Sequence, residues 1–222
     1  MNEEELIELI QDCPKLYHMA ENGSWPSIEK HGLLSTSALL DLFGIKGNSR
    51  SKIESTHRPT STSISGGSLS GAVIRDQMPM SNSGLMKALP SNITPRDWYR
   101  LLNSKVFFWL TKDRLFRLTS AKAYKNKQHD VLEICTSSLV AAHKERLWLC
   151  PINSGCTKPF PHKRDFNTFS RISTYQYQHW KQKRKAGERV VELAVDYEVK
   201  DILKHVTAVY KVRQKEIISR IY

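Results

Sequence analysis

The apolar positions near the start of the chain predict a helix, a strand and a second helix, in that order. Residues 2–12 carry an apolar face behind a glutamate-rich first turn, which is typical of an amphipathic helix. Residues 16–19 form an apolar and aromatic run typical of a buried strand, and a polar turn follows it. We expect Ser24 to cap the next helix, with Pro26 in its first turn and Gly32 at its end.

Later apolar runs predict more strands, separated by short helices. The predicted strands cover residues 105–110, 129–134, 147–150, 189–196 and 206–212. The predicted helices cover residues 37–43, 95–102, 113–124 and 137–143. This mixture of elements indicates an α+β fold with helices on the outside.

One long polar stretch interrupts the pattern. Between residues 47 and 71, fifteen of twenty-five positions are Ser, Thr or Gly, which leaves too little apolar content for a core segment. We therefore expect a long, mobile surface loop at about residues 46–71, inside a single domain that spans residues 1–222.

Composition narrows the class of protein. No run approaches the roughly 20 apolar residues that cross a bilayer, and the acidic start of the chain is unlike a signal peptide, so we expect a cytoplasmic protein. Four scattered cysteines are too few for a disulfide framework, and we expect free thiols. Zinc binding by Cys150, Cys156 and His162 is disfavoured because their spacing lacks the close pair typical of structural sites.

The charge of the chain points to a polyanionic partner, since the formal net charge is +12 and the pI is near 9.6. Residues 158–189 alone hold nine Lys or Arg against two acidic residues, with six aromatic residues among them. In one interpretation the aromatic rings stack on unpaired bases while a basic run meets phosphates: Lys181, Lys183, Arg184 and Lys185. In the other, the run is a solvated surface over core aromatics.

Two titratable residues are candidates for a site. His18 ends the first predicted strand and would face the N-terminus of the next helix, where anions are favoured, although a core histidine is the alternative. Alternation along residues 189–196 turns the Glu192 carboxylate away from its apolar neighbours. A carboxylate buried within a sheet is unusual, which makes Glu192 a candidate for a functional role. Glu188 is the competing carboxylate, roughly 13 Å away along an ideal strand.

Three motifs in this order resemble the ADP-ribosyltransferases, above all the bacterial toxins that modify nucleic acids. The first motif is the Tyr17-His18 strand followed by Pro-Ser-Ile and Gly-Leu-Leu-Ser. The second is the aromatic strand at residues 105–110 with small residues in the helix after it. The third is Glu192-Leu-Ala-Val, followed by the strand at residues 206–212. The resemblance implies a pair of mostly antiparallel sheets around a cleft that holds NAD.

The resemblance also implies roles for individual residues. His18 would hold a ribose of NAD, and the backbone of Met19, which stands where the family often has a small residue, would clasp the nicotinamide amide. The ring of Trp109 or Phe108 would stack on nicotinamide, with Tyr124 as a further candidate. Glu192, or Glu188 in its place, would be the catalytic carboxylate.

Arg75 has two interpretations, because it either pairs with the adjacent Asp76 or binds a phosphate of NAD or of the target.

The function implied is transfer of ADP-ribose from NAD to a DNA or RNA base, with release of nicotinamide and no metal. A single-stranded target is expected, since a base must be unstacked before it can react. Enzymes that this chain resembles are commonly toxins paired with a neutralising antitoxin, some in phage defence. The alternatives are an RNA 2′-phosphotransferase on the same fold and a non-catalytic nucleic-acid-binding module. The sequence leaves open whether the acceptor is DNA, RNA or protein.

Overall fold

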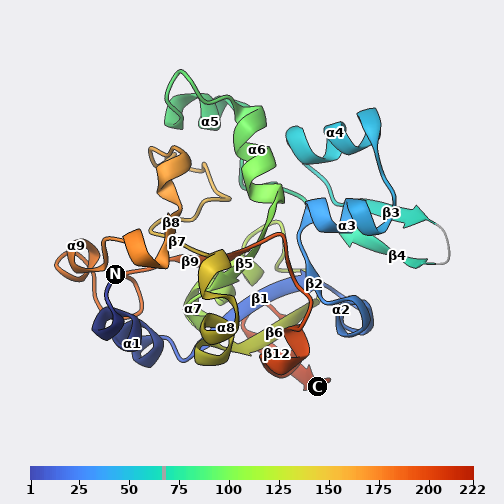
Figure 1. Cartoon of the computed structure of the whole chain (residues 1–222). Helices are drawn as coiled ribbons and strands as arrows, with labels where there is room; N and C mark the ends of the chain where they lie inside the picture. The colour runs from blue at the N-terminus through green and yellow to red at the C-terminus, as the bar shows by residue number, and fades with distance from the viewer. Residues whose placement is uncertain (67–68) are drawn as a thin grey trace.

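Helices and antiparallel strands alternate in the computed structural model of the chain, which describes residues 1–66 and 69–222 (Figure 1). The α+β class predicted from the sequence is confirmed. The α-helices are α1 (Glu3–Asp12), α2 (Trp25–His31), α3 (Thr36–Leu42), α4 (Gly47–Ser55), α5 (Asn82–Ala88), α6 (Pro95–Asn103), α7 (Lys112–Thr119), α8 (Thr136–His143) and α9 (Tyr177–Lys181). Short 3₁₀ turns are η1 (Lys144–Arg146), η2 (Phe166–Thr168), η3 (Ile172–Thr174) and η4 (Ile202–Lys204).

The main sheet has eight strands in the order β12-β11-β6-β1-β5-β9-β7-β8. They are β1 (Lys15–Glu21), β5 (Lys105–Trp109), β6 (His129–Cys135), β7 (Leu147–Cys150), β8 (Ser170–Arg171), β9 (Glu192–Asp196), β11 (Val206–Arg213) and β12 (Glu216–Arg220). Two small antiparallel ribbons join β2 (Leu33–Leu34) to β10 (Glu198–Val199) and β3 (Thr62–Gly66) to β4 (Leu69–Ile74).

The middle of the main sheet is its weakest junction. β1 pairs with β6 along its whole length, and β5 pairs with β9 along its whole length. In contrast, β1 and β5 are in register at Tyr17 and Trp109 alone among the described residues. The two separate sheets that we expected are therefore joined into one, which divides at this point into two groups of four strands.

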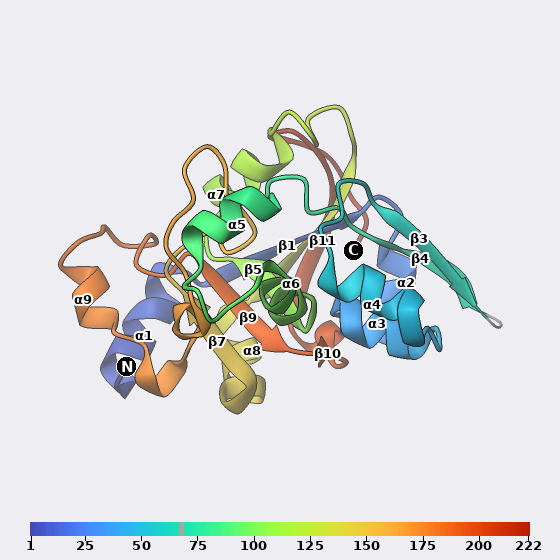
Figure 2. The ribbon, with the colours of Figure 1, turned by 90° about the horizontal axis from the view of Figure 1, so that it is seen from above.

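Apolar side chains cover both faces of this sheet. On one face Leu16, Phe108 and Leu193 belong to the main core, which α1 and α8 close. On the other face α7 packs over Tyr17, and α5 with α6 packs beside it in a separate cluster. Figure 2 shows α5 and α7 on one side of the sheet and α1 and α8 on the other. The central strands are thus held from both sides, whereas β12 at one edge is exposed along its length.

The helix ends largely follow the local sequence. Asn2 and Glu5 form a capping box at the start of α1. Ser24 holds the N-cap position of α2, but its side chain makes no capping hydrogen bond with any described residue. The Trp25 N–H donates instead to Asp130 Oδ2 on β6, at 2.9 Å. Gly32 ends α2 with φ of 83°, and a Cβ there would lie 2.6 Å from the Lys200 backbone.

The prediction of a long loop at residues 46–71 is wrong, because this stretch forms α4 and the β3–β4 hairpin; residues 67–68 lie outside the described residues. Arg50 on α4 forms ion pairs with Asp41 and Glu54. Ile64 and Ile74 of the hairpin pack with Leu40 in a small apolar cluster of their own. The hairpin projects from the body beside α3 and α4 in both views (Figures 1 and 2).

Two predicted boundaries also change. The helix expected at residues 113–124 ends at Thr119 in α7, and Tyr124 lies in the turns that follow. The strand expected at residues 189–196 begins at Glu192, because residues 186–189 form a turn and a bend, and residues 190–191 are not part of a strand. Glu188 is therefore not part of the strand that carries Glu192.

Candidate active site

A cavity of about 850 Å³ opens where β1 and β5 separate. This volume falls within the range of about 300–1,000 Å³ that is usual for small-molecule and cofactor sites. Its walls come from β1, β5, the β3–β4 hairpin, the start of α2 and the turn at residues 153–155. The weak junction in the sheet thus provides the space for a ligand.

Most of the predicted site residues line this cavity. Those that do are His18, Met19, Arg75, Phe108, Trp109, Tyr124 and Glu192. The described lining does not include Glu188, Lys181, Lys183, Arg184 or Lys185. Segments that lie far apart in the sequence therefore meet at one site, while the basic run does not reach it.

His18 is held as a neutral imidazole. Its Nδ1 lies 2.8 Å from the Phe107 carbonyl oxygen. A carbonyl oxygen only accepts, so Nδ1 carries the proton and Nε2 is left with a lone pair. Burial lowers the pKa of His18 to about 4, and the charge of Arg75 acts in the same direction. Near pH 7 this histidine can accept a hydrogen bond from a ligand hydroxyl.

Glu192 is a buried carboxylate at the edge of the cavity. It is 4% exposed, and its register places it between Trp109 on β5 and Cys150 on β7. Burial raises the pKa of Glu192 to about 7, although the Ser154 N–H donates to Oε2 at 3.1 Å and partly opposes this shift. A carboxyl group that titrates near neutral pH is suited to proton transfer.

The turn that contacts Glu192 is fixed by a residue that the sequence did not single out. Arg164 is buried, and its guanidinium donates to the carbonyl oxygens of Ser154 and Cys156, each at 2.8 Å. The same group lies over the Trp98 ring, 5.6 Å from its centroid. In the sequence Arg164 is one cation among nine in a basic segment, and its position alone gives no signal of burial.

Glu188 lies outside the cavity lining and forms an ion pair with Arg114 on α7. Its backbone N–H donates to the Lys185 carbonyl oxygen in a turn. The expectation that Glu188 shares a strand face with Glu192 is wrong, because β9 begins later than the alternating pattern indicates. Of the two carboxylates, Glu192 is the one that a ligand in the cavity could contact.

Arg75 reaches across the cavity to the first strand. Its Nη1 donates to the Met19 carbonyl oxygen at 3.1 Å, and its Nε lies 4.0 Å from Glu21. The guanidinium also lies over the Tyr124 ring, 4.9 Å from its centroid. The Tyr124 hydroxyl in turn donates to Asp76 Oδ1 at 2.6 Å. Within the described chain, Arg75 and Asp76 are thus connected through Tyr124 and not by a direct ion pair.

The Met19 carbonyl, expected to clasp an amide, is therefore already occupied by Arg75. A ligand amide would have to share this oxygen or displace the guanidinium. A second arginine that the sequence did not single out, Arg58, lines the cavity and donates from Nε to the Arg75 carbonyl oxygen at 3.3 Å.

The two aromatic candidates on β5 differ in their surroundings. Phe108 is 1% exposed within the main core, although its ring lies 5.9 Å from that of His18. Trp109 is only partly buried and pairs with Glu192 in the register of β5 and β9. Trp109 therefore has more ring surface available for a ligand.

The basic run lies mostly against α1 and its own helix. Lys181 forms an ion pair with Glu8 at 2.8 Å, and α9 lies beside α1 in Figure 1. Arg184 donates to the Pro151 carbonyl oxygen at 2.6 Å and covers the Trp180 ring at 4.0 Å. Lys183 and Lys185 are exposed. The run precedes β9 directly in the sequence, yet none of its four residues belongs to the described lining of the cavity, since continuity along the chain does not fix direction in space.

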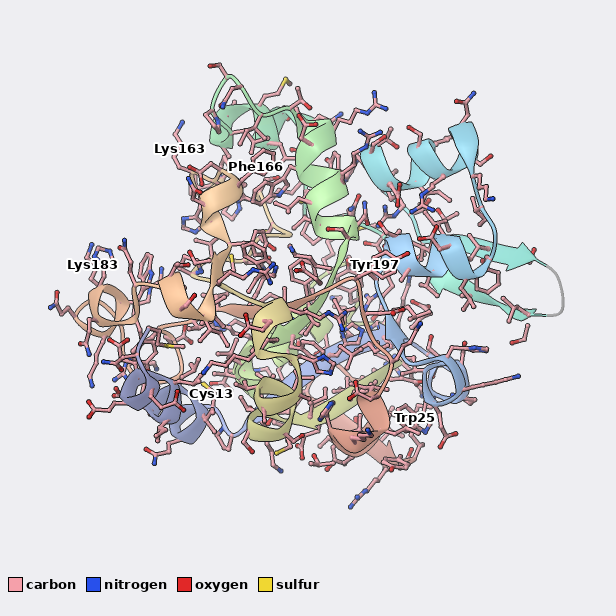
Figure 3. All side chains as sticks on the ribbon, viewed as in Figure 1. Cys13, Trp25, Lys163, Phe166, Lys183 and Tyr197 are labelled. Carbon is pink, nitrogen blue, oxygen red and sulfur yellow. The ribbon has the colours of Figure 1, made fainter. Side chains whose placement is uncertain are left out.

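Burial also changes the interpretation of the aromatic residues in this segment. Phe169, Tyr175 and Tyr177 are 1–3% exposed, so they are core residues and are not free to stack on bases. Phe160 is 84% exposed and Phe166 is 50% exposed. Figure 3 shows Phe166 close to Lys163, well away from Lys183 in the same view.

Comparison with known proteins gives a family but no activity. The model of a family of unknown function, DUF7002, matches residues 14–206, which include every residue of the candidate site. The chain belongs to this family. No curated protein matches it. Across the described part of the chain, no helix combines the length and apolar character needed to cross a membrane.

Proposed function

We propose that this DUF7002 protein transfers ADP-ribose from NAD to a nucleic acid, with Glu192 as the catalytic carboxylate. The observation that supports the proposal is that one cavity brings together a neutral His18, the partly exposed Trp109 and the buried Glu192. These residues come from β1, β5 and β9. This is the order of the three motifs in the ADP-ribosyltransferases that the sequence resembles.

The chemistry requires a negative charge beside the sugar. The bond between ribose C1′ and nicotinamide breaks with its electron pair leaving on nicotinamide, so positive charge develops on the ribose. A carboxylate beside the ribose stabilises that charge. The acceptor then uses a lone pair to bond to C1′, and it releases a proton. Glu192, with its pKa near 7, can take that proton.

The other residues of the cavity would orient NAD. His18 Nε2 would accept a hydrogen bond from a ribose hydroxyl, since Nδ1 is committed to the Phe107 carbonyl oxygen. Trp109 would stack on the nicotinamide ring. Arg75 would leave the Met19 carbonyl oxygen for a phosphate of NAD, which frees Met19 for the nicotinamide amide. Most of the rate would come from positioning and charge stabilisation.

The acceptor would approach along the segment that follows the Asn153–Gly155 turn. This turn lines the cavity, and the same segment continues to the exposed Phe160 and Phe166. Lys158 and Lys163 are exposed beside them. Exposed aromatic rings with neighbouring cations are the elements of single-strand recognition, because rings stack on bases and cations meet phosphates. This surface replaces the α9 run as the proposed contact with nucleic acid.

An enzyme that modifies nucleic acid would be toxic to the cell that makes it. We therefore propose that it acts as a toxin, as in toxin–antitoxin or phage-defence systems, and that a dedicated antitoxin protein neutralises it. Expression of the wild type should inhibit growth in cells that lack the partner, whereas Glu192→Gln should be tolerated.

The deciding experiment incubates the protein with NAD labelled in its adenylate part and with separate pools of single-stranded DNA, single-stranded RNA and protein. Label should enter one nucleic-acid pool while nicotinamide is released. Glu192→Gln should abolish the transfer, and Glu188→Gln serves as a matched control that keeps it. Transfer to protein alone would refute the acceptor class.

Two alternative functions give different products in the same experiment. An RNA 2′-phosphotransferase acts on RNA that already carries a 2′-phosphate, and it removes that phosphate without leaving ADP-ribose on the RNA. A binding module consumes no NAD but binds oligonucleotides with strong salt dependence.

A further inference from the structure

Two histidines and an aspartate meet on the chain outside the cavity. His143 ends α8, whereas Asp201 and His205 flank η4. One donor atom from each of the three residues lies within 4.8 Å of the other two. None of the three belongs to the described lining of the cavity, so the cluster is separate from the proposed transfer site.

The Asp201 carboxylate lies between the two imidazoles. Its Oδ1 is 2.8 Å from His143 Nε2, and its Oδ2 is 3.4 Å from His205 Nε2. The two imidazole rings are 5.4 Å apart at an angle of 76°. Both rings therefore present a nitrogen to the same small volume.

One nitrogen in this cluster has no satisfied hydrogen bond. His205 is 3% exposed, and its Nε2 is buried without a hydrogen-bond partner among the described atoms. Its Nδ1 lies 2.8 Å from Ser138 Oγ on α8. If Nδ1 donates to that hydroxyl, Nε2 is unprotonated and directs a lone pair at the cluster. Asp201 Oδ2 lies 3.4 Å away but forms no hydrogen bond with Nε2, and buried polar atoms are rarely left without a partner, so a ligand at this nitrogen would satisfy it.

We propose that His143, Asp201 and His205 bind one Zn²⁺ ion. Imidazole and carboxylate are standard zinc ligands at about 2.0–2.2 Å, which places neighbouring ligand atoms roughly 3.3 Å apart in a tetrahedral site. Asp201 approaches His143 Nε2 through Oδ1 at 2.8 Å and His205 Nε2 through Oδ2 at 3.4 Å, which are distances of this order from the two oxygens of one carboxylate. Asp201 is 31% exposed, so water can fill the fourth position. Ser138 orients His205 as the outer hydrogen-bond partner that metal-binding histidines usually have.

The role of the ion would be structural. It links the end of α8 to the segment that runs from β10 to β11. The same segment contains Lys200, whose backbone packs against Gly32 at the end of α2. The ion would therefore stabilise the connection between the main sheet and the small β2–β10 ribbon, without taking part in transfer.

The test uses the full-length protein after removal of bound metal with a chelator, and the probe is Zn²⁺ itself. Calorimetric titration should give one Zn²⁺ per chain, and Zn²⁺ should raise the melting temperature. His143→Ala and Asp201→Asn should each weaken binding at least about tenfold, and Ser138→Ala should weaken it to a smaller extent. The control Cys156→Ser/His162→Ala removes two of the three residues whose spacing was considered for zinc in the sequence, and it should bind Zn²⁺ like the wild type.

Two titration results would each overturn the proposal: no Zn²⁺ binding by the wild type at micromolar free metal, or unchanged affinity in folded His143→Ala. A spectrum of the wild type with Co²⁺ keeps the test valid if the variants do not fold. Tetrahedral nitrogen and oxygen ligands give visible absorption without a thiolate charge-transfer band. The presence of that band would place the metal on cysteine and refute this site.

Discussion

Replacing Glu192 by glutamine should abolish transfer and, at alkaline pH, make the protein more stable than the wild type. Glutamine keeps the shape of the side chain and still accepts the hydrogen bond from the Ser154 N–H. It cannot ionise, so it lacks the charge that the transition state needs. It also lacks the unfavourable free energy of holding a charged carboxylate in a buried position.

The magnitude follows from the pKa. Glu192 has a pKa of about 7 in the folded protein, against an ordinary value of 4.5. Since the folded pKa is the higher of the two, the unfolded chain loses this proton first, and stability falls as pH rises from about 4.5 to 7. The full difference corresponds to about 3 kcal/mol above pH 7. Below about pH 4.5 the carboxyl is protonated in both states and contributes no difference.

The assay is urea unfolding of the wild type and Glu192→Gln at several pH values from 4.5 to 8.5. The stability difference between them should be smallest near pH 4.5 and should grow to about 3 kcal/mol in favour of the variant at pH 8.5. Other titrating groups, His18 among them, contribute equally to both proteins and cancel. The reasoning fails if the difference does not change with pH, or if the variant becomes the less stable protein at high pH. Separately, transfer activity of Glu192→Gln equal to that of the wild type would refute the catalytic role of Glu192.

The remaining predictions test the surroundings of Glu192. His18→Ala should weaken NAD binding at least about tenfold by calorimetry, from loss of a hydrogen bond worth about 1.5 kcal/mol; unchanged affinity in the folded variant would identify a core histidine. Arg164→Met should lower stability by about 3 kcal/mol in urea and reduce transfer by releasing the Ser154 turn; wild-type activity would contradict that positioning role. Phe160→Ser/Phe166→Ser should weaken oligonucleotide binding while Lys183→Ser/Lys185→Ser should have a smaller effect, as measured by fluorescence anisotropy, and the opposite ranking would restore the α9 run as the contact surface.

Local sequence was sufficient for the elements whose signals lie within a few residues. The capping boxes of α1 and α6 depend on side chains only three positions apart. The aromatic strand at residues 105–110 and the strand at residues 129–134 also formed. Residues 106–110 are a continuous apolar run, which favours burial whichever neighbours it meets. The ends of an element differed from the prediction where residues far away in the sequence determine them, as at the start of β9.

The site was predictable in its residue types but not in its assembly. His18, Trp109 and Glu192 were identified from their own segments, and all three line one cavity. Their proximity depends on the separation of β1 and β5 after Tyr17, which is a property of strand pairing across the sheet. The choice between Glu192 and Glu188 was likewise decided by where β9 begins and by the ion pair with Arg114.

The polar stretch after residue 46 shows the limit of composition as a guide. Its Ser, Thr and Gly content is typical of a loop, yet it folds into the helix α4 and the β3–β4 hairpin, and the hairpin forms one wall of the cavity. The hairpin is held by a few apolar contacts to Leu40 and by Arg58, whose guanidinium bonds to the Arg75 backbone carbonyl and the Asn103 side chain.

For this protein the sequence determined the class of fold, most strands and the chemistry available to a site. The tertiary structure decided which residues share a cavity, which aromatic rings are buried and which cations face solvent. The physical reason is that propensity and periodicity act over a few residues, whereas burial and ion pairing depend on contacts between segments far apart in the chain. Tyr177 and Phe160 occupy similar basic surroundings in the sequence, but only packing against α1 makes the first a core residue and leaves the second exposed.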